Sequence, residues 1–93
     1  MDILKVRKSS PSKKLGKFIY MNVVRENKFV LQAIGAGAIS QAIKAVIEAN
    51  KLLAAKALSI SIVPSFEDIE AEDFTTTGIR FYVIIQTSDG GRQ

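Results

Sequence analysis

The stretch at residues 32–48, QAIGAGAISQAIKAVIE, decides the fold of this chain. It begins at the end of an apolar run of strand length, continues through a glycine-marked turn, and ends as an amphipathic helix. Gly35 and Gly37 have no Cβ atom, so the backbone of the turn can take positive φ and other groups can come close to it. If Gly37 has a positive φ, a side chain at that position would be strained. The helix is expected to leave the turn at Gly37 and Ala38.

This helix is expected to bury one stripe of apolar side chains. The spacing i, i+4, i+7 and i+8 places the following residues on the buried side: Ile39, Ile43, Val46 and Ile47, with Leu53 further on. The opposite side then carries Ser40, Gln41, Lys44, Glu48 and Lys51. The pattern predicts a helix to about Leu53, with one face in a core.

Length and composition restrict the class of protein. Ninety-three residues suffice for one small domain, which we place at residues 1–87, followed by a flexible tail at residues 88–93. The chain has no cysteine and no histidine, which excludes disulfides, thiolate and imidazole metal ligands, and Cys or His nucleophile–base pairs. We therefore expect a protein that is not an enzyme and that uses no cofactor and no metal.

The sequence also has features that bear on its location. No stretch approaches the roughly 18 uncharged apolar residues of a membrane span. No apolar signal region follows the charged N-terminal segment. We expect a cytoplasmic protein with no membrane partner. Association with the nucleoid is an alternative that we keep open.

Strand and helix patterns alternate along the remainder of the chain. We predict strands at residues 3–7, 29–34, 58–63 and 79–86, and helices at residues 11–26 and 37–53. Ser10 before Pro11 is expected to cap the first helix, and Pro64 to end the third strand before a long connection at residues 65–78. The inner face of the first helix is expected to carry Leu15, Phe18, Ile19, Asn22 and Val23.

The order β-α-β-α-β-β predicts an α/β (α+β) two-layer sandwich. Both crossovers should be right-handed, so both helices should cover the same face of a mixed four-stranded sheet. The other sheet face would remain open, and the side chains there include Val63, Arg80, Tyr82 and Ile84. This face is more apolar than a simple solvated surface, and we expect it to form a homodimer or a larger homo-oligomer.

Basic residues are concentrated near the N-terminus. Residues 1–28 contain eight Lys and Arg against two Asp and Glu, a local charge of +6. The loops that follow adjacent parallel strands lie at one sheet edge, so residues 8–14 and residues 35–37 should be neighbours. A helix N-terminus with free N–H groups favours anions, and such an edge can engage backbone phosphates. The candidate nucleic-acid-binding residues are Lys8, Ser9, Ser10, Lys13, Lys14, Lys17, Gly35, Gly37, Gln41 and Lys44.

Each of these features also has a purely structural interpretation. The glycines would serve only a tight turn and close helix packing, and the lysines only solubility. The glycine turn does not match the dinucleotide-binding fingerprint, because Ser40 occupies the third small position and no acidic residue follows about 20 residues later.

An acidic segment lies far from these lysines in sequence. Residues 67–73 contain Glu67, Asp68, Glu70, Glu72 and Asp73 and no basic residue. Their spacing is not that of a calcium loop, and the central glycine of such a loop is missing. We interpret the segment as solvated, or as a surface for a basic protein partner.

Several motifs together resemble the stage V sporulation protein S family. They are the opening DILKV with Ser9, Ser10 and Pro11, the run QAIGAGA at residues 32–38 with QA and KAV in the helix, and IVP with Phe66, Asp68 and Ile69. More distantly, the chain is similar to the Alba chromatin proteins and to the C-terminal domain of the third bacterial translation initiation factor. The resemblance implies a sheet of order 1-2-4-3, a regulatory role in sporulation or cell development, a dimer or larger assembly, and nucleic-acid binding. The chain departs from the family pattern in its lysine-rich first helix, in Phe18 and Tyr20, and in its tail.

Two functions follow as alternatives. The first is a non-enzymatic regulatory protein that binds DNA or RNA. The second is a protein-interaction or assembly module that associates with itself through the open sheet face. The acidic segment distinguishes the chain from the Alba proteins, which have a basic arm at this place, so their mode of groove contact is not carried over to it.

Overall fold

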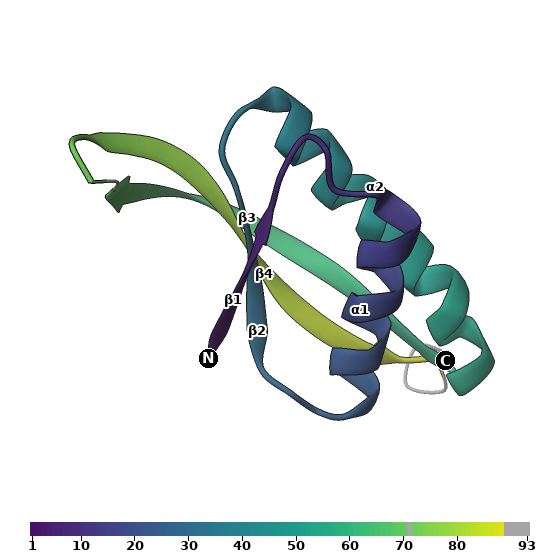
Figure 1. Ribbon diagram of the computed structural model, residues 1–93. Coiled ribbons are helices and arrows are strands. Elements are labelled where there is room, and N and C mark those ends of the chain that lie inside the picture. The colour runs from purple at the N-terminus through teal and green to yellow at the C-terminus, as the bar shows by residue number, and fades with distance from the viewer. Residues whose placement is uncertain (71, 89–93) are drawn as a thin grey trace.

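The computed structural model describes residues 1–70 and 72–88. Within them the elements follow the predicted order (Figure 1). They are β1 (Asp2–Val6), α1 (Ser12–Val24), β2 (Phe29–Ala33), α2 (Ala36–Leu53), a short 3₁₀ helix η1 (Ala54–Lys56), β3 (Leu58–Glu70) and β4 (Thr75–Thr87). No helix in the described part of the chain is both long and apolar enough to cross a membrane.

The strands form one mixed sheet in the order β1-β2-β4-β3, as predicted. β1 and β2 are parallel, while β4 runs antiparallel to both of its neighbours. Both helices cover the same face of this sheet (Figure 1), which confirms the two-layer sandwich. β2 lies inside the sheet and is buried along its whole length, as its apolar sequence indicates.

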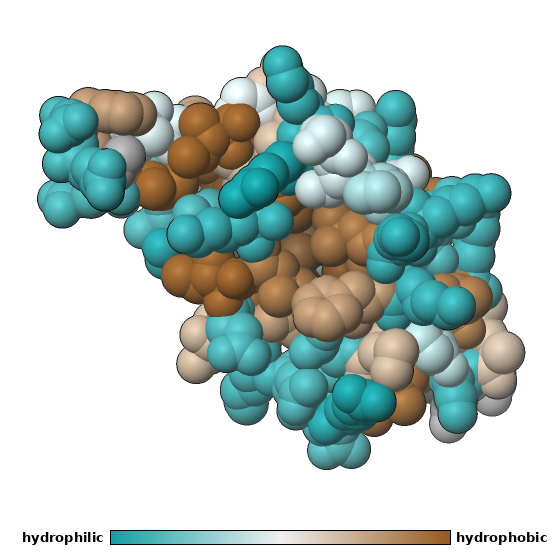
Figure 2. All heavy atoms as spheres, in the orientation of Figure 1, coloured by the Kyte–Doolittle hydropathy of each residue, from teal (hydrophilic) through white to brown (hydrophobic). Residues whose placement is uncertain are grey.

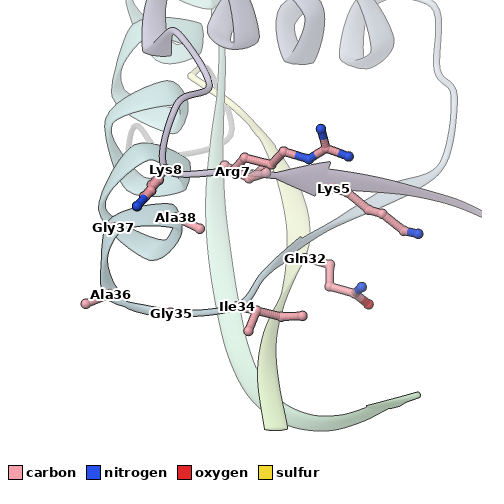
Figure 3. Close-up of a pocket in the computed structure, with 10 residues that line it drawn as sticks. Lys5, Arg7, Lys8, Gln32, Ile34, Gly35, Ala36, Gly37 and Ala38 are labelled. Carbon is pink, nitrogen blue, oxygen red and sulfur yellow. The ribbon is translucent and has the colours of Figure 1, made fainter. Parts of the chain in front are cut away.

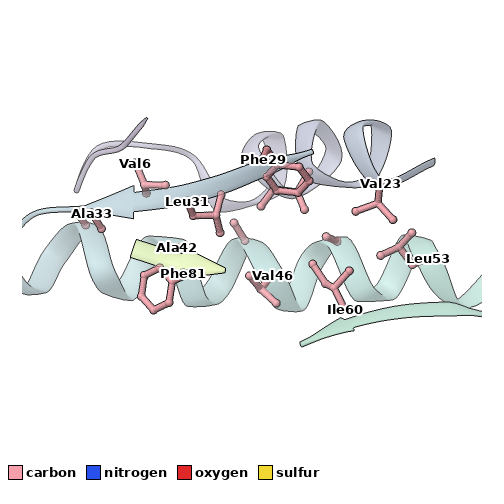
Figure 4. Packing of buried hydrophobic residues seen from close by; sticks show 14 residues of the cluster. Val6, Val23, Phe29, Leu31, Ala33, Ala42, Val46, Leu53, Ile60 and Phe81 are labelled. Atoms are coloured by element: carbon pink, nitrogen blue, oxygen red, sulfur yellow. The ribbon is translucent and has the colours of Figure 1, made fainter. Parts of the chain in front are cut away.

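The core lies between the sheet and the two helices. Leu31 of β2, Phe81 of β4 and Ile60 of β3 point toward α2, and Val46 of α2 points back toward them (Figure 4). The alternation of strand side chains thus follows the prediction, because every second residue of a strand faces the same layer. Ile19 and Leu53 complete the core from the helices and are fully buried.

The buried face of α2 differs from the predicted stripe. Its buried residues are Ala38, Ala42, Ala45, Val46, Ala49 and Leu53. Ile43 is exposed and Ile47 is 53% exposed, so the prediction was wrong for both isoleucines. The reason is the close packing of the layers, since the small alanine side chains allow α2 to lie against the sheet and α1. At the contact with α1, a Cβ atom on Gly16 would lie only 2.6 Å from Glu48 Cβ.

Helix α1 is shorter than predicted and also has a different inner face. Gly16, Ile19 and Val23 are buried, whereas Phe18 is exposed and Asn22 is only partly buried. The helix cap is Pro11, not Ser10, and no side chain caps the helix. Ser10 Oγ instead accepts a hydrogen bond from the Arg7 backbone N–H at 2.9 Å, within the preceding loop.

The largest departure from prediction is the length of the β3–β4 hairpin. Pro64 does not end β3 but pairs with Phe81 inside a ladder that continues to the pair Glu70 and Thr75. A proline is tolerated there because β3 is an edge strand, where its missing N–H can face the unpaired side. Most of the predicted connection at residues 65–78 is therefore strand. The hairpin extends well beyond the sheet (Figure 1).

The predicted flexible tail at residues 88–93 lies outside the described residues except for Ser88. The backbone N–H of Ser88 donates a hydrogen bond to the Ala57 carbonyl at 2.8 Å. This contact joins the end of β4 to the residue after η1.

Candidate functional site

A surface depression lies where β1 and β2 end and α2 begins. Its lining residues are Lys5, Val6, Arg7, Lys8, Gln32, Ile34, Gly35, Ala36, Gly37 and Ala38 (Figure 3). The volume is about 490 Å³. We call this feature the cationic depression. It confirms the prediction that the loops after the first two strands are neighbours, since it contains residues from both.

Two glycines shape the backbone of the cationic depression, and the prediction of positive φ in this turn is confirmed for Gly35 but not for Gly37. Gly35 has φ 91° and ψ 155° and stands immediately before α2. Gly37 lies inside the first turn of α2 and has no positive φ, so the argument from a strained turn at Gly37 was wrong. The reason for a small residue at Gly37 is space, because a Cβ atom there would lie 2.9 Å from Lys8 Cβ.

A hydrogen bond holds the β1–α1 loop against α2. The side-chain Nε2 of Gln41 donates to the Ser10 carbonyl oxygen at 2.6 Å. Ser10 in turn accepts from the Arg7 backbone N–H, which fixes the loop beside Lys8. Gln41 and Ser10, both predicted as site residues, therefore position the loop. Ser9, which lies between Lys8 and Ser10 in the sequence, is exposed.

The charges around the cationic depression have one sign. Lys5, Arg7 and Lys8 are all exposed, and none of them lies within 4 Å of a carboxylate in the described part of the chain. The first turn of α2 contains no acidic residue and no side chain caps it. The free N–H groups of a helix start carry about half a positive charge, which adds to the field of the three cations.

Three polar or charged lining residues, Lys5, Arg7 and Gln32, were absent from the predicted site. Lys5 and Arg7 alternate with apolar residues in and after β1, and they were counted in the charge of residues 1–28 but not assigned to the site. Gln32 is the one polar residue within β2, and it is 6% exposed. Its Oε1 accepts a hydrogen bond from Arg80 Nε at 2.9 Å. A buried amide in an otherwise apolar strand was the signal that could have identified it.

The remaining predicted lysines lie elsewhere. Lys13, Lys14 and Lys17 of α1 line a separate shallow depression of about 430 Å³, together with Glu48, Lys51 and Leu52. Lys44 is exposed on α2. The single cationic edge of the prediction is thus divided over two surfaces, one at the strand ends and one along the helices.

The open face of the sheet carries a row of apolar side chains. Val63, Tyr82 and Val30 are register neighbours across β3, β4 and β2, with Ile3 of β1 beside Val30. Tyr82 is 37% exposed, and Ile84, Val63 and Ile3 are also exposed. Arg80 lies on this face as predicted, but it is partly buried by its hydrogen bond to Gln32.

The part of the hairpin beyond the sheet is acidic. It consists of residues 67–70 and 75–78, with Glu72 and Asp73 near its end, and we call it the acidic arm. Glu67 forms an ion pair with Arg80 at its base, with Oε1 and Nη1 3.7 Å apart. Phe66 beside the arm is 80% exposed and Phe74 near its end is 62% exposed. The described residues contain no group of three acidic, Cys or His side chains arranged to hold a metal ion.

Hydrophobic and hydrophilic side chains are separated on the surface. Figure 2 shows hydrophobic side chains over the strands and at the base of the arm, while hydrophilic side chains cover the end of the arm. The arm therefore presents charge together with the exposed ring of Phe74 near its end, and apolar surface at its base.

The fold and the cationic depression together define a small α+β sandwich domain with a positively charged sheet edge. The family model of stage V sporulation protein S (SpoVS) matches residues 2–86, nearly the whole chain. The chain belongs to this family. Membership indicates a role related to sporulation, and the family is not a known family of enzymes.

Proposed function

We propose that this chain is a non-enzymatic regulatory protein that binds nucleic acid during sporulation or cell development, with the cationic depression as its phosphate-binding surface. One observation supports the proposal. Lys5, Arg7 and Lys8 line the cationic depression together with the uncapped start of α2. Cations and free N–H groups are the donors that phosphate oxygens accept from.

The shape of the cationic depression favours contact with the phosphate backbone of a nucleic acid and not with its bases. The cationic depression is shallow, and its lining contains no aromatic side chain on which a base could stack. Phosphate contacts fix position on a nucleic acid without reading its sequence. We therefore propose binding with little sequence preference to DNA or RNA.

A titration at several salt concentrations tests this proposal. If each of Lys5, Arg7 and Lys8 displaces a counterion, the log–log salt slope on duplex DNA should be about −2.7, at about −0.9 for each phosphate contact. Single strands and structured RNA should be titrated in parallel. Arg7→Glu with Lys8→Glu should abolish binding.

The matched control is Lys28→Glu with Lys56→Glu, which changes the net charge equally at positions outside the cationic depression. This control should retain most of the affinity. Equal loss in both variants would mean that only the total charge matters, and no binding of the wild type at low salt would refute the proposal. Lys13, Lys14 and Lys17 can be reversed in a third variant, to learn whether the helix surface contributes.

The second candidate function is self-association through the open sheet face, as a protein-interaction or assembly module. It is favoured by the apolar row that includes Val63, Tyr82 and Ile84. Apolar area removed from water contributes about 25 cal/mol per Å², so burying such a row on two copies would stabilise a dimer. Lys5 and Gln32 of the cationic depression lie on this same sheet face, next to Ile3 and Arg80, so a dimer formed through the apolar row would border the phosphate-binding surface.

A further inference from the structure

Two surfaces of opposite charge lie at the same end of the molecule. A Cβ atom on Gly78, at the base of the acidic arm, would lie 3.0 Å from Ile34 Cγ1, and Ile34 lines the cationic depression. The arm base and the cationic depression are therefore adjacent. From there the arm projects away from the sheet (Figure 1).

In the structure, the outer charges of the arm lie away from the cationic depression of their own chain. Beyond the pair Phe66 and Ile79, four further cross-strand pairs continue the ribbon, and at about 3.3 Å per residue they extend it by roughly 13 Å. In the described residues, Asp68, Glu70, Glu72 and Asp73 have no basic partner within 4 Å. Both surfaces thus present uncompensated charge.

The lining of the cationic depression suits a carboxylate with an apolar neighbour. Besides Lys5, Arg7 and Lys8, it contains the side chain of Gln32, which is more than nine-tenths buried. Only the Oε1 of Gln32 has a partner among the described residues, so its Nε2 remains a free donor. Val6 and Ile34 add apolar area to the lining. The arm offers matching chemistry, with carboxylates next to the exposed ring of Phe74.

We propose that the acidic arm of one copy of this chain docks on the cationic depression of a second copy, and that the exchange is reciprocal. Because both surfaces lie at one end of the molecule, a two-fold axis can place each arm on the partner copy in the same step. Such an interface is closed and produces a dimer, not a filament. The charge complementarity of arm and depression singles out a second copy as the occupant.

This contact has a consequence for the proposed function, although the contact itself does not depend on it. The arm would cover the surface that we assign to phosphate groups. Self-association and nucleic-acid binding would then compete for Lys5, Arg7 and Lys8, and the arm would act as an inhibitor supplied by the other copy.

A charge-exchange experiment tests the docking. One variant reverses the arm by Asp68→Lys, Glu70→Lys and Glu72→Lys, and the other reverses the depression by Lys5→Glu, Arg7→Glu and Lys8→Glu. In sedimentation at about 50 mM salt, each variant alone should associate at least about tenfold more weakly than an equal mixture of the two. In the mixture both contacts of the reciprocal pair have regained opposite charges.

A matched control distinguishes docking of the arm from attraction between chains of opposite net charge. Lys28→Glu, Lys51→Glu and Lys56→Glu gives the same net charge as the depression variant at positions outside the cationic depression. Mixed with the arm variant, it should associate more weakly than the depression variant does, because one of the two reciprocal contacts then joins like charges. A contact through Tyr82 would be present in all samples alike and would not produce the difference. If the two mixtures behave alike, or if the arm variant alone associates as tightly as the wild type, the proposal is wrong.

A second measurement avoids charge reversal. The natural chain has no cysteine, so Glu70→Cys and Lys8→Cys each introduce a single thiol. Oxidation of a mixture of these two chains should give a disulfide-linked pair in several-fold excess over the pair formed with Lys56→Cys in place of Lys8→Cys. Equal yields would overturn the docking. A chain that docks but binds no nucleic acid would refute only the proposed function, and a chain that binds nucleic acid without docking would refute only this inference.

Discussion

Replacing Gly35 by alanine measures the backbone cost of the turn between β2 and α2. Gly35 has φ 91° and ψ 155°, a conformation that residues with a Cβ atom rarely adopt. Holding a non-glycine residue in such a region costs about 1–3 kcal/mol. A Cβ atom at this position would have no described heavy atom within 4 Å, apart from its chain neighbours. The expected loss is therefore backbone strain and not steric overlap.

The loss should be visible in thermal unfolding followed by circular dichroism. For a domain of this size, 1 kcal/mol lowers Tm by about 4–8 °C, so a loss of about 2 kcal/mol predicts a decrease of roughly 8–16 °C. Urea unfolding should give the same free-energy difference with an unchanged m-value.

Gly37→Ala is the matched control, since Gly37 lies two residues later without positive φ. Alanine inside a helix is more favourable than glycine by up to about 1 kcal/mol. The new Cβ atom would lie 2.9 Å from Lys8 Cβ, closer than ordinary van der Waals contact, so the loop must shift, which offsets this gain. We expect Gly37→Ala to unfold near the wild-type Tm. If Gly35→Ala does so as well, the strain argument is refuted.

Three further outcomes are expected. Gly16→Ala should lower the free energy of unfolding by about 1–3 kcal/mol in urea titrations, because the new Cβ atom would lie 2.6 Å from Glu48 Cβ and the two helices would have to separate. A variant as stable as the wild type would contradict the close packing of α1 and α2. Tyr82→Glu should weaken self-association in sedimentation at tens of micromolar if the sheet face is an interface, whereas a monomeric wild type would remove that proposal. Asp68→Asn with Glu70→Gln should tighten nucleic-acid binding in the titration above, since fewer like charges oppose the phosphates, and unchanged affinity would argue against any role of the arm.

The order of elements and the faces of the strands could be predicted because both depend on local pattern. Alternation in β4 placed Phe81 inward and Tyr82 outward, and the structure agrees. The neighbourhood of the β1–α1 loop and the start of α2 followed from a general rule about parallel strands. None of these predictions requires knowledge of distances between layers.

The inner faces of the helices could not be predicted in the same way. Hydrophobicity favours burying Ile43 and Ile47, but the structure buries alanines because the layers approach each other closely. That closeness is a property of the assembled helices, including the contact at Gly16. Likewise, Pro64 can continue a strand only at a sheet edge, and the edge is defined by the pairing of all four strands.

The candidate site was only partly predictable for a related reason. Its location followed from topology, but its side chains depend on which way each residue faces. Lys5 and Gln32 are register partners on adjacent strands, a fact that becomes apparent only when the pairing is known. Lys13 and Lys14 were assigned to the same edge by sequence proximity to Lys8, and the turn into α1 carries them to another surface.

The length of the β3–β4 hairpin also implies a gradient of local stability. β4 has strands on both sides only where Ala33 to Val30 pair with Ile79 to Tyr82, whereas the acidic arm beyond has just two strands. A two-stranded ribbon is at best marginally stable in water, so it can open without unfolding the domain. Amide hydrogens of the arm should exchange with solvent much faster than those of β2. The end of the molecule that carries the acidic side chains can therefore adapt its shape, while the sheet that supports the cationic depression stays rigid.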